Sequence, residues 1–206
     1  MFFYFCTRAR LICMKLIFIA FPPKPLPPPV FFLKPDTALL RNNQPFFLPD
    51  YTQDLRATLS LVLRISRLGR SIGASFAARY FDAVGVGMDI FAHDLRQKYA
   101  LAHQPADGAH AFDYAAPVSA GWIPAAEIPA INDCSLRWTL NGKETAQNAA
   151  IAYTPEIIIP HISQFITLRT GDYIFINTSL TSDTLHPGDR LVACLNGKEM
   201  LKVEIR

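Results

Sequence analysis

The sequence has few charges and no long apolar run. Charged residues make up 18% of the 206 residues, and the 20 Lys and Arg residues are scattered rather than gathered into a basic stripe. Nucleic-acid-binding surfaces concentrate positive charge, so no nucleic-acid partner is expected. The apolar N-terminal stretch is interrupted by Arg8, Arg10 and Lys15. No segment is therefore long enough to cross a bilayer, and no membrane partner is expected.

Cysteine is also scarce, and its spacing excludes the common metal-binding patterns. The four cysteines are far apart and form no CxxC or Cys/His pair; they are Cys6, Cys13, Cys134 and Cys194. Free thiols are typical of a reducing compartment, so we expect a cytoplasmic protein. A cleaved signal peptide fits poorly, because Pro22 and Pro23 stand where small residues should mark the cleavage site.

What the sequence does contain is enough apolar material for one core. Half of the residues are hydrophobic, which excludes a disordered chain, and the length suits a single domain. Met14 offers an alternative start, with residues 1–13 an upstream extension that need not be structured. We therefore predict one domain over residues 14–206.

Proline is concentrated in the first quarter of the chain. Residues 22–29 read PPKPLPPP, which predicts a stiff, extended polyproline connector. The same sequence is of the type that SH3-like domains bind. Of the two interpretations, a spacer is favoured over a docking motif.

Hydrophobic patterning indicates a protein built mainly from strands. Residues 55–69 alternate with period two, which predicts a strand with one buried face, although a helix over 55–68 competes. Residues 83–90 predict a strand of small residues, and residues 74–82 and 92–103 predict helices. Two Asn-Gly pairs between alternating runs predict tight hairpins. Thr154 and Pro155 predict the start of a helix that Pro160 should kink or shorten. The predicted class is mainly β with a few helices (α+β), in two packed or rolled sheets.

Six segments in order resemble one protein family. They are VFFLKP, LRISRLGRSI, VGVGMDIFAHDL, AFDYAAPVSAGW, ISQFITLRTGD and HPGDRL. Together they resemble the fumarylacetoacetate hydrolase family over nearly the whole chain. The resemblance implies a mixed β-sandwich roll of the fumarylacetoacetase C-terminal-like type, a homodimer and a divalent cation, Mg²⁺ or Mn²⁺. It also implies small-molecule substrates that are 2-oxo or β-diketo acids, whose enolate the metal stabilises.

The resemblance makes Asp89 a metal ligand, but the other two carboxylates of the family are missing. The family carries Glu-x-Glu on an earlier strand, and these positions are Thr58 and Ser60 here. We expect ordinary residues on the solvent face of the strand there, and weakened metal binding. The alternative for Asp89 is a cap on the helix that follows it. Asp94 and Asp113 match family positions for which we expect hydrogen-bonded structural roles.

Other departures affect the substrate and the base. A family Lys is His110 here, a Gln that contacts substrate in some members is Arg96, and Asn177 replaces a Gly beside the retained Thr178. These matches make Thr178, Arg96 and His110 candidates for substrate binding. No His precedes His93, so the family's water-activating base is not visible, and His110 remains the one catalytic candidate.

Two functions stay open on the sequence alone. The first is a divalent-metal-dependent hydrolase or isomerase of 2-oxo acids. The second is a catalytically impaired or inactive member that retains the fold as a binding or structural protein.

Overall fold

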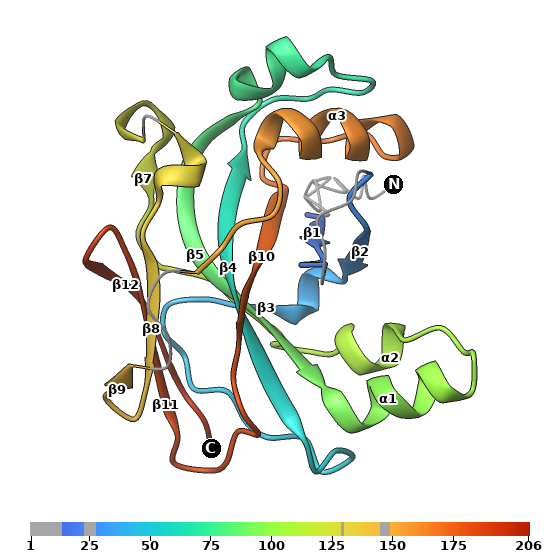
Figure 1. Cartoon of the computed structure of the whole chain (residues 1–206), viewed down its shortest axis with the longest axis vertical. Helices are drawn as coiled ribbons and strands as arrows, with labels where there is room; N and C mark the ends of the chain where they lie inside the picture. The colour runs from blue at the N-terminus through green and yellow to red at the C-terminus, as the bar shows by residue number, and fades with distance from the viewer. Residues whose placement is uncertain (1–13, 23–27, 129, 145–148) are drawn as a thin grey trace, which may run out of the picture.

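The computed structural model of the chain is shown in Figure 1 and describes residues 14–22, 28–128, 130–144 and 149–206. The proposed upstream extension, residues 1–13, lies outside these ranges, as does most of the polyproline segment. Within them the chain is mainly β with a few helices, as predicted. None of the described helices is both long and apolar enough to span a membrane.

The largest sheet has six strands in the order β2-β1-β10-β4-β5-β7. β1 pairs in parallel with β10, and the other neighbours in this sheet are antiparallel. Their bounds are β1 Leu16–Ile19, β2 Phe31–Lys34, β4 Leu55–Ile65, β5 Phe81–Ala92, β7 Ile123–Pro124 and β10 Tyr173–Thr181. The sheet is therefore mixed. Its first strand, β1, lies between β2, which follows it closely in the chain, and β10, which comes from the C-terminal part.

A second sheet has the order β12-β11-β8-β9, and β3 pairs with β6 separately. These strands are β3 Leu39–Leu40, β6 Ala116–Pro117, β8 Leu136–Leu140, β9 Lys143–Glu144, β11 Arg190–Leu195 and β12 Lys198–Glu204. The helices are η1 Asp36–Ala38, η2 Ala74–Arg79, α1 His93–Leu101, α2 Asp107–His110, η3 Ala125–Glu127, η4 Ile131–Asp133 and α3 Pro155–Phe165. In Figure 1, α3 lies toward one end of the long strands, and α1 and α2 lie toward the other.

Strand β4 buries both of its faces. The predicted core face is confirmed, because its alternating residues from Leu55 to Leu63 are at most 2% exposed. The prediction that Thr58 and Ser60 face solvent is wrong, since they are only 7% and 0% exposed. Their hydroxyls instead contact Thr181 and Asn177 on β10. Further along the same face, Val62 belongs to a second, smaller apolar cluster: Leu16, Phe18, Ala38, Val62, Ala116, Val118 and Phe175.

Both tight hairpins predicted from the Asn-Gly pairs are present. Asn141 and Gly142 have φ of 54° and 79°, and Asn196 and Gly197 have φ of 51° and 78°. Positive φ at both central residues is what a tight hairpin of this type requires, and these turns join β8 to β9 and β11 to β12.

Helix α3 begins as predicted, and Pro160 does not shorten it. Pro155 is its first residue, but the helix continues through Pro160 to Phe165. The predicted shortening is wrong because Ile158, Ile159 and Ile162 are all fully buried, so packing holds the turn that proline weakens. Of the helix predicted over residues 74–82, residues 74–79 form the 3₁₀ helix η2, whereas Phe81 and Asp82 begin β5.

Candidate functional site

The predicted site residues converge on one cavity. A cavity of about 310 Å³ is lined by Thr58, Asp89, Arg96, His110 and Thr178, among other residues. β4, β5 and β10 supply Thr58, Asp89 and Thr178 from three adjacent strands, which run side by side in Figure 1. Ser60 lies two residue pairs further along the sheet, opposite Gly87, and is fully buried.

Asp89 forms a buried ion pair with Lys34. Lys34 Nζ lies 2.7 Å from Asp89 Oδ1, with the two side chains 0% and 3% exposed. The same Nζ donates to the carbonyl oxygens of Ile90 at 2.9 Å and Ala115 at 2.8 Å. A neutral amine has only two protons, so three acceptors around Nζ require the ammonium form. A fixed positive charge from the chain itself therefore occupies one side of the Asp89 carboxylate.

The ion pair sets the charge state of the carboxylate. Burial alone raises the pKa of Asp89, but the Lys34 charge and the hydrogen bonds from His110 and Lys34 outweigh it and hold the pKa at about 2. Burial lowers the pKa of Lys34 from its ordinary value, and the charge of Asp89 opposes that fall. Asp89 is thus an anion at neutral pH and a weak base.

The second oxygen of Asp89 is occupied by an amide. Asn177 Nδ2 donates to Asp89 Oδ2 at 3.0 Å, and Ser60 Oγ donates to Asn177 Oδ1 at 2.7 Å. Thr58 is paired opposite Asp89 in the sheet, and its hydroxyl lies 2.8 Å from the Thr181 hydroxyl. One continuous chain of contacts, from Ser60 through Asn177 and Asp89 to Lys34, therefore fills the middle of the site.

These residues do not fit a magnesium or manganese ion. In the described ranges no three His, Cys, Asp or Glu side chains come together in a way that could hold a metal. The nearby acid Asp54, just before β4, pairs with Arg56 at 2.9 Å. A hard divalent cation needs several oxygen ligands, yet here it would meet one carboxylate already bound by an ammonium and an amide. The donor set is that of a closed polar network.

Arg96 and His110 form the polar wall of the cavity. His110 Nδ1 lies 3.5 Å from Asp89 Oδ1, and its ring stacks on Phe91 at 5.3 Å between centroids. The Arg96 guanidinium lies 4.5 Å from the Phe91 ring centroid and donates to His93 Nδ1 at 3.1 Å. Burial and the charges of Arg56 and Arg96 lower the pKa of His93. Neutral His93 can therefore accept that hydrogen bond and hold the guanidinium in place.

Thr178 and Asp94, two positions that match the family, make hydrogen bonds within the fold. The Thr178 hydroxyl donates to the Leu59 carbonyl oxygen at 2.8 Å, so its proton is used within the sheet. Asp94 accepts hydrogen bonds from the Thr52 hydroxyl at 2.5 Å and the Gln53 backbone at 3.0 Å, which ties α1 to the segment before β4. Asp113 is exposed and lies outside the lining of this cavity.

Neither Lys34 nor the role of the Asn177 amide was predicted from the sequence. Lys34 is the one charge in the apolar strand β2 and the one buried residue of that strand, and a lysine is rarely fully buried without a partner. The partner itself lies 55 positions away, beyond the reach of any local pattern. The replacement of Gly by Asn177 was visible in the sequence, but its link to Ser60 appears only when β10 and β4 are paired.

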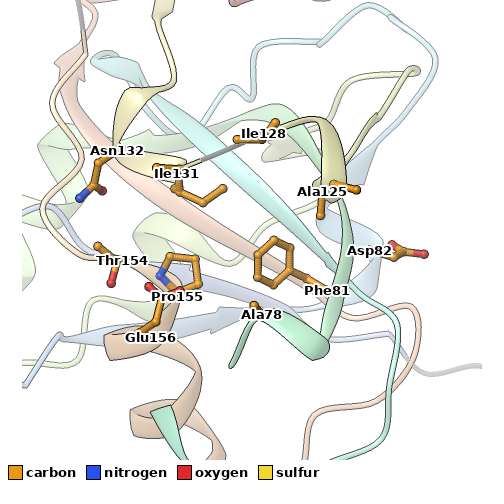
Figure 2. A pocket seen from close by; sticks show the side chains of 12 residues that line it. Ala78, Phe81, Asp82, Ala125, Ile128, Ile131, Asn132, Thr154, Pro155 and Glu156 are labelled. Atoms are coloured by element: carbon orange, nitrogen blue, oxygen red, sulfur yellow. The ribbon is translucent and has the colours of Figure 1, made fainter. Parts of the chain in front are cut away.

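A larger cavity lies elsewhere and lacks a comparable cluster. Figure 2 shows this space of about 590 Å³, which η2, the start of β5, η3, η4 and the first turn of α3 enclose. Phe81, Ile131 and Pro155 face its centre, whereas the Asp82 carboxylate points away in the figure and pairs with Arg64 at 2.8 Å. It contains none of the predicted site residues.

Comparisons with known proteins agree on a single family. A family model described as "Fumarylacetoacetate (FAA) hydrolase C-terminal" matches residues 15–206. The oxaloacetate tautomerase YcgM of Escherichia coli K12 is 30% identical over 175 residues, covering 84% of this chain and 80% of that protein. The structure of 2-hydroxyhepta-2,4-diene-1,7-dioate isomerase from Mycobacterium marinum has a TM-score of 0.82 at 25% identity, covering 94% of this chain and 74% of that one. Fumarylpyruvate hydrolase from Pseudomonas aeruginosa, solved with Mn²⁺ and pyruvate, shares the fold with a TM-score of 0.82 at 20% identity, covering 94% and 89%.

Proposed function

The chain belongs to the fumarylacetoacetate hydrolase family, and from that premise we propose that it binds a small 2-oxo acid without a divalent cation on Asp89. One observation carries the proposal. Lys34 Nζ at 2.7 Å and Asn177 Nδ2 at 3.0 Å contact both oxygens of Asp89, the only carboxylate among the described residues that line the cavity. The substrate class comes from the family. Thr58, Ser60 and Asn177 are the residues of this network that depart from the family, whereas Lys34 lies in a segment that resembles it.

Arg96 is the group best suited to hold the acid. A guanidinium presents a planar fork of donors that matches a carboxylate, and partial burial strengthens such a contact. His93 and Phe91 fix its orientation, and His110 lies across the same cavity. A volume of about 310 Å³ suits a small acid of the oxaloacetate class.

The same network argues against fast metal-assisted turnover. A cation stabilises an enolate by binding two of its oxygens, and the ligands for that cation are replaced. Asp89, with a pKa of about 2, is too weak a base to take its place at neutral pH. The competing function is the metal-dependent hydrolase or isomerase, which the retained cavity and the tautomerase relative favour.

A thermal melt separates the two functions. Oxalate, an enolate mimic, is titrated into the protein in EDTA and again with Mg²⁺ or Mn²⁺. We expect oxalate to raise the melting temperature equally with and without metal, because ligand binding stabilises the folded state. Arg96→Gln should abolish the rise, whereas the matched control Arg79→Gln on η2 should retain it.

Two results would count against the proposal. A rise with metal alone that grows with oxalate would establish a working metal site, and no response to oxalate would remove the binding function. The variant Thr58→Glu/Ser60→Glu/Asn177→Gly restores the family's residues. It should gain a Mg²⁺-dependent rise that the uncharged control Thr58→Gln/Ser60→Gln/Asn177→Gly lacks.

A further inference from the structure

A third cavity is lined mainly by aromatic side chains. It has a volume of about 460 Å³, and its walls come from residues 46–51, which precede β4, and residues 112–114, which follow α2. We call it the aromatic groove; its aromatic and acidic residues are Phe46, Phe47, Tyr51, Phe112, Asp113 and Tyr114. It shares no lining residue with the 310 Å³ cavity and plays no part in the proposed function.

Backbone hydrogen bonds anchor both walls of the aromatic groove. The Phe46 amide donates to the Glu204 carbonyl oxygen and the Arg206 amide donates to the Phe46 carbonyl oxygen, each at 2.8 Å. In the other wall, the Tyr114 amide donates to the Thr37 carbonyl oxygen at 3.1 Å. Tyr114 has a φ of 64°, which a bulky side chain rarely adopts, and such conformations gather at ligand sites. The shape of the groove is therefore set by the fold itself.

Tyr51 and Phe112 form a corner of two ring walls. Their planes cross at 81° with centroids 6.0 Å apart, and Phe112 packs in turn on the buried Phe46 at 6.5 Å. Tyr51 and Tyr114 are 48% and 53% exposed, so ring surface stays open to a ligand. The face of an aromatic ring is electrically negative, and a cation is attracted to it. Two rings set nearly at right angles can therefore contact one cation from two sides.

The carboxylates beside these rings carry unpaired negative charge. Asp113 lines the aromatic groove, and Asp50 directly precedes Tyr51 in the chain. Neither carboxylate has an ion-pair partner in the part of the chain that the structure describes. Burial raises the pKa of Tyr51, and the charges of Asp113 and Asp50 raise it further, which shows that both act on this ring.

The bases close to the aromatic groove are paired with other acids. Arg206 is bonded through its backbone to the segment before β4, but its guanidinium lies 3.6 Å from Glu204. Lys34 Nζ lies 5.9 Å from the centroid of Phe112, and its charge is balanced by Asp89 at 2.7 Å. No base is present among the described residues that line the groove. A cationic ligand would therefore meet negative charge that the chain does not neutralise.

We propose that the aromatic groove binds a small organic cation that carries a quaternary ammonium group. Such a group has no N–H to satisfy, and its methyl groups bring a diffuse positive charge into contact with ring faces. A primary ammonium is more strongly hydrated and would lose more on entering an aromatic site. The volume of about 460 Å³ accepts a trimethylammonium group together with a polar substituent.

The charges of the groove disfavour the other occupants. A 2-oxo acid would be repelled by Asp113 and Asp50, so a second site for the substrate class of the 310 Å³ cavity is not expected. An apolar surface of a second copy would cover the rings, but it would also remove the unpaired carboxylates from water without giving them a partner. A cation satisfies the rings and the carboxylates together.

A pair of probes of equal shape tests the proposal. Choline is titrated into the full chain, and so is its neutral isostere, in which a carbon atom replaces the nitrogen. Ligand-observed NMR follows the methyl signals of both. We expect saturable binding of choline and binding of the isostere that is at least about tenfold weaker, because only the charge differs. Oxalate should not displace choline.

Four variants locate the binding. Tyr51→Ala should weaken choline binding at least about fivefold, whereas Tyr51→Phe, which keeps the ring, should stay within about twofold of the unaltered chain. Asp113→Asn should weaken binding about threefold through the lost charge. Phe76→Ala, on η2 and also 48% exposed, is the matched control and should change nothing. The melting temperature of each variant shows that it is folded.

Three results would overturn the proposal. They are the absence of saturable choline binding, equal binding of choline and its isostere, and unchanged binding in a folded Tyr51→Ala variant. Sedimentation tests the second copy: a dimer that Tyr51→Ala dissociates would assign the groove to an interface between copies and not to a cation. None of these outcomes depends on oxalate or metal binding, so this proposal and the proposed function fail separately.

Discussion

At the scale of single residues, one ammonium decides the character of the candidate site. Lys34 satisfies three acceptors with three protons, and one of them is the carboxylate that the family resemblance assigns to a metal. A buried ion pair gains little net stability over apolar residues of equal size, but breaking it leaves a charge buried alone. The main effect of this pair on stability is therefore seen when one partner is removed and the other charge stays buried.

Removing the ammonium should destabilise the protein strongly. Lys34→Met should lower the free energy of unfolding by about 3–5 kcal/mol, because Asp89 is left as an unpaired buried anion. Urea denaturation measures this change. The double variant Lys34→Met/Asp89→Asn removes the stranded charge and should recover part of the loss.

A surface ion pair provides the control for this prediction. Arg64→Met breaks a pair with Asp82 whose side chains are 38% and 48% exposed, and it should change stability by less than about 1 kcal/mol. If Lys34→Met and Arg64→Met lowered the free energy of unfolding equally, the burial of the Lys34–Asp89 pair would not explain the effect.

At the scale of elements, the pairing of β4 with β5 places the site. Their register sets Thr58 opposite Asp89 and Ser60 opposite Gly87. Gly87 is required by packing: an added Cβ would lie 2.5 Å from Phe175 Cε1 and 2.7 Å from Val62 Cγ2. The small residue lets β5 approach the second apolar cluster closely.

A single methyl group at this position should disturb the sheet. Gly87→Ala should lower the free energy of unfolding by about 1–3 kcal/mol through overpacking, measured by the shift in the urea midpoint. Gly121→Ala is the matched control, since an added Cβ there meets nothing within 4 Å. If the two variants were equally stable, the ring of Phe175 would be able to move away from the added methyl group, and the predicted overpacking would be wrong.

The elements were largely predictable from the sequence, and the site only in part. Alternation over residues 55–69 predicted a strand, which the structure has as β4 from Leu55 to Ile65, and the competing helix is absent there; the Asn-Gly pairs predicted both hairpins, because these are local signals. The burial of Thr58 and Ser60 was not predictable from β4 alone, since their partners Thr181 and Asn177 lie on β10, more than 100 positions later. The Lys34–Asp89 pair likewise depends on contacts between distant segments.

At the scale of the whole molecule, the buried charges make stability depend on pH. The folded pKa of Asp89, about 2, is below its ordinary value of 3.8, so the folded state favours the anion. This stabilising contribution is complete above about pH 4 and is lost as the pH falls toward 2. Its size is on the order of 2 kcal/mol.

Acid unfolding of an Asp89→Asn variant measures that contribution. Urea midpoints are compared at pH 5.5 and 2.5 for the unaltered chain and for the variant. Other carboxylates titrate in both proteins, so their effects cancel in the comparison. We expect the variant to lose less stability on acidification, and identical losses would show that Asp89 does not carry this charge when folded.

The position of β1 has a consequence for how the chain is made. Its four residues are at most 1% exposed in the finished protein, and they pair with β10 at residues 173–176. The backbone of Lys15 is hydrogen-bonded to Asp172, 157 positions later. During synthesis β2 follows β1 closely and can pair with one of its edges, but β10, which pairs with the other edge, is made only near the end of translation. The nascent chain therefore exposes one apolar strand edge for most of its synthesis, and an unpaired edge of this kind makes a folding chain prone to aggregation.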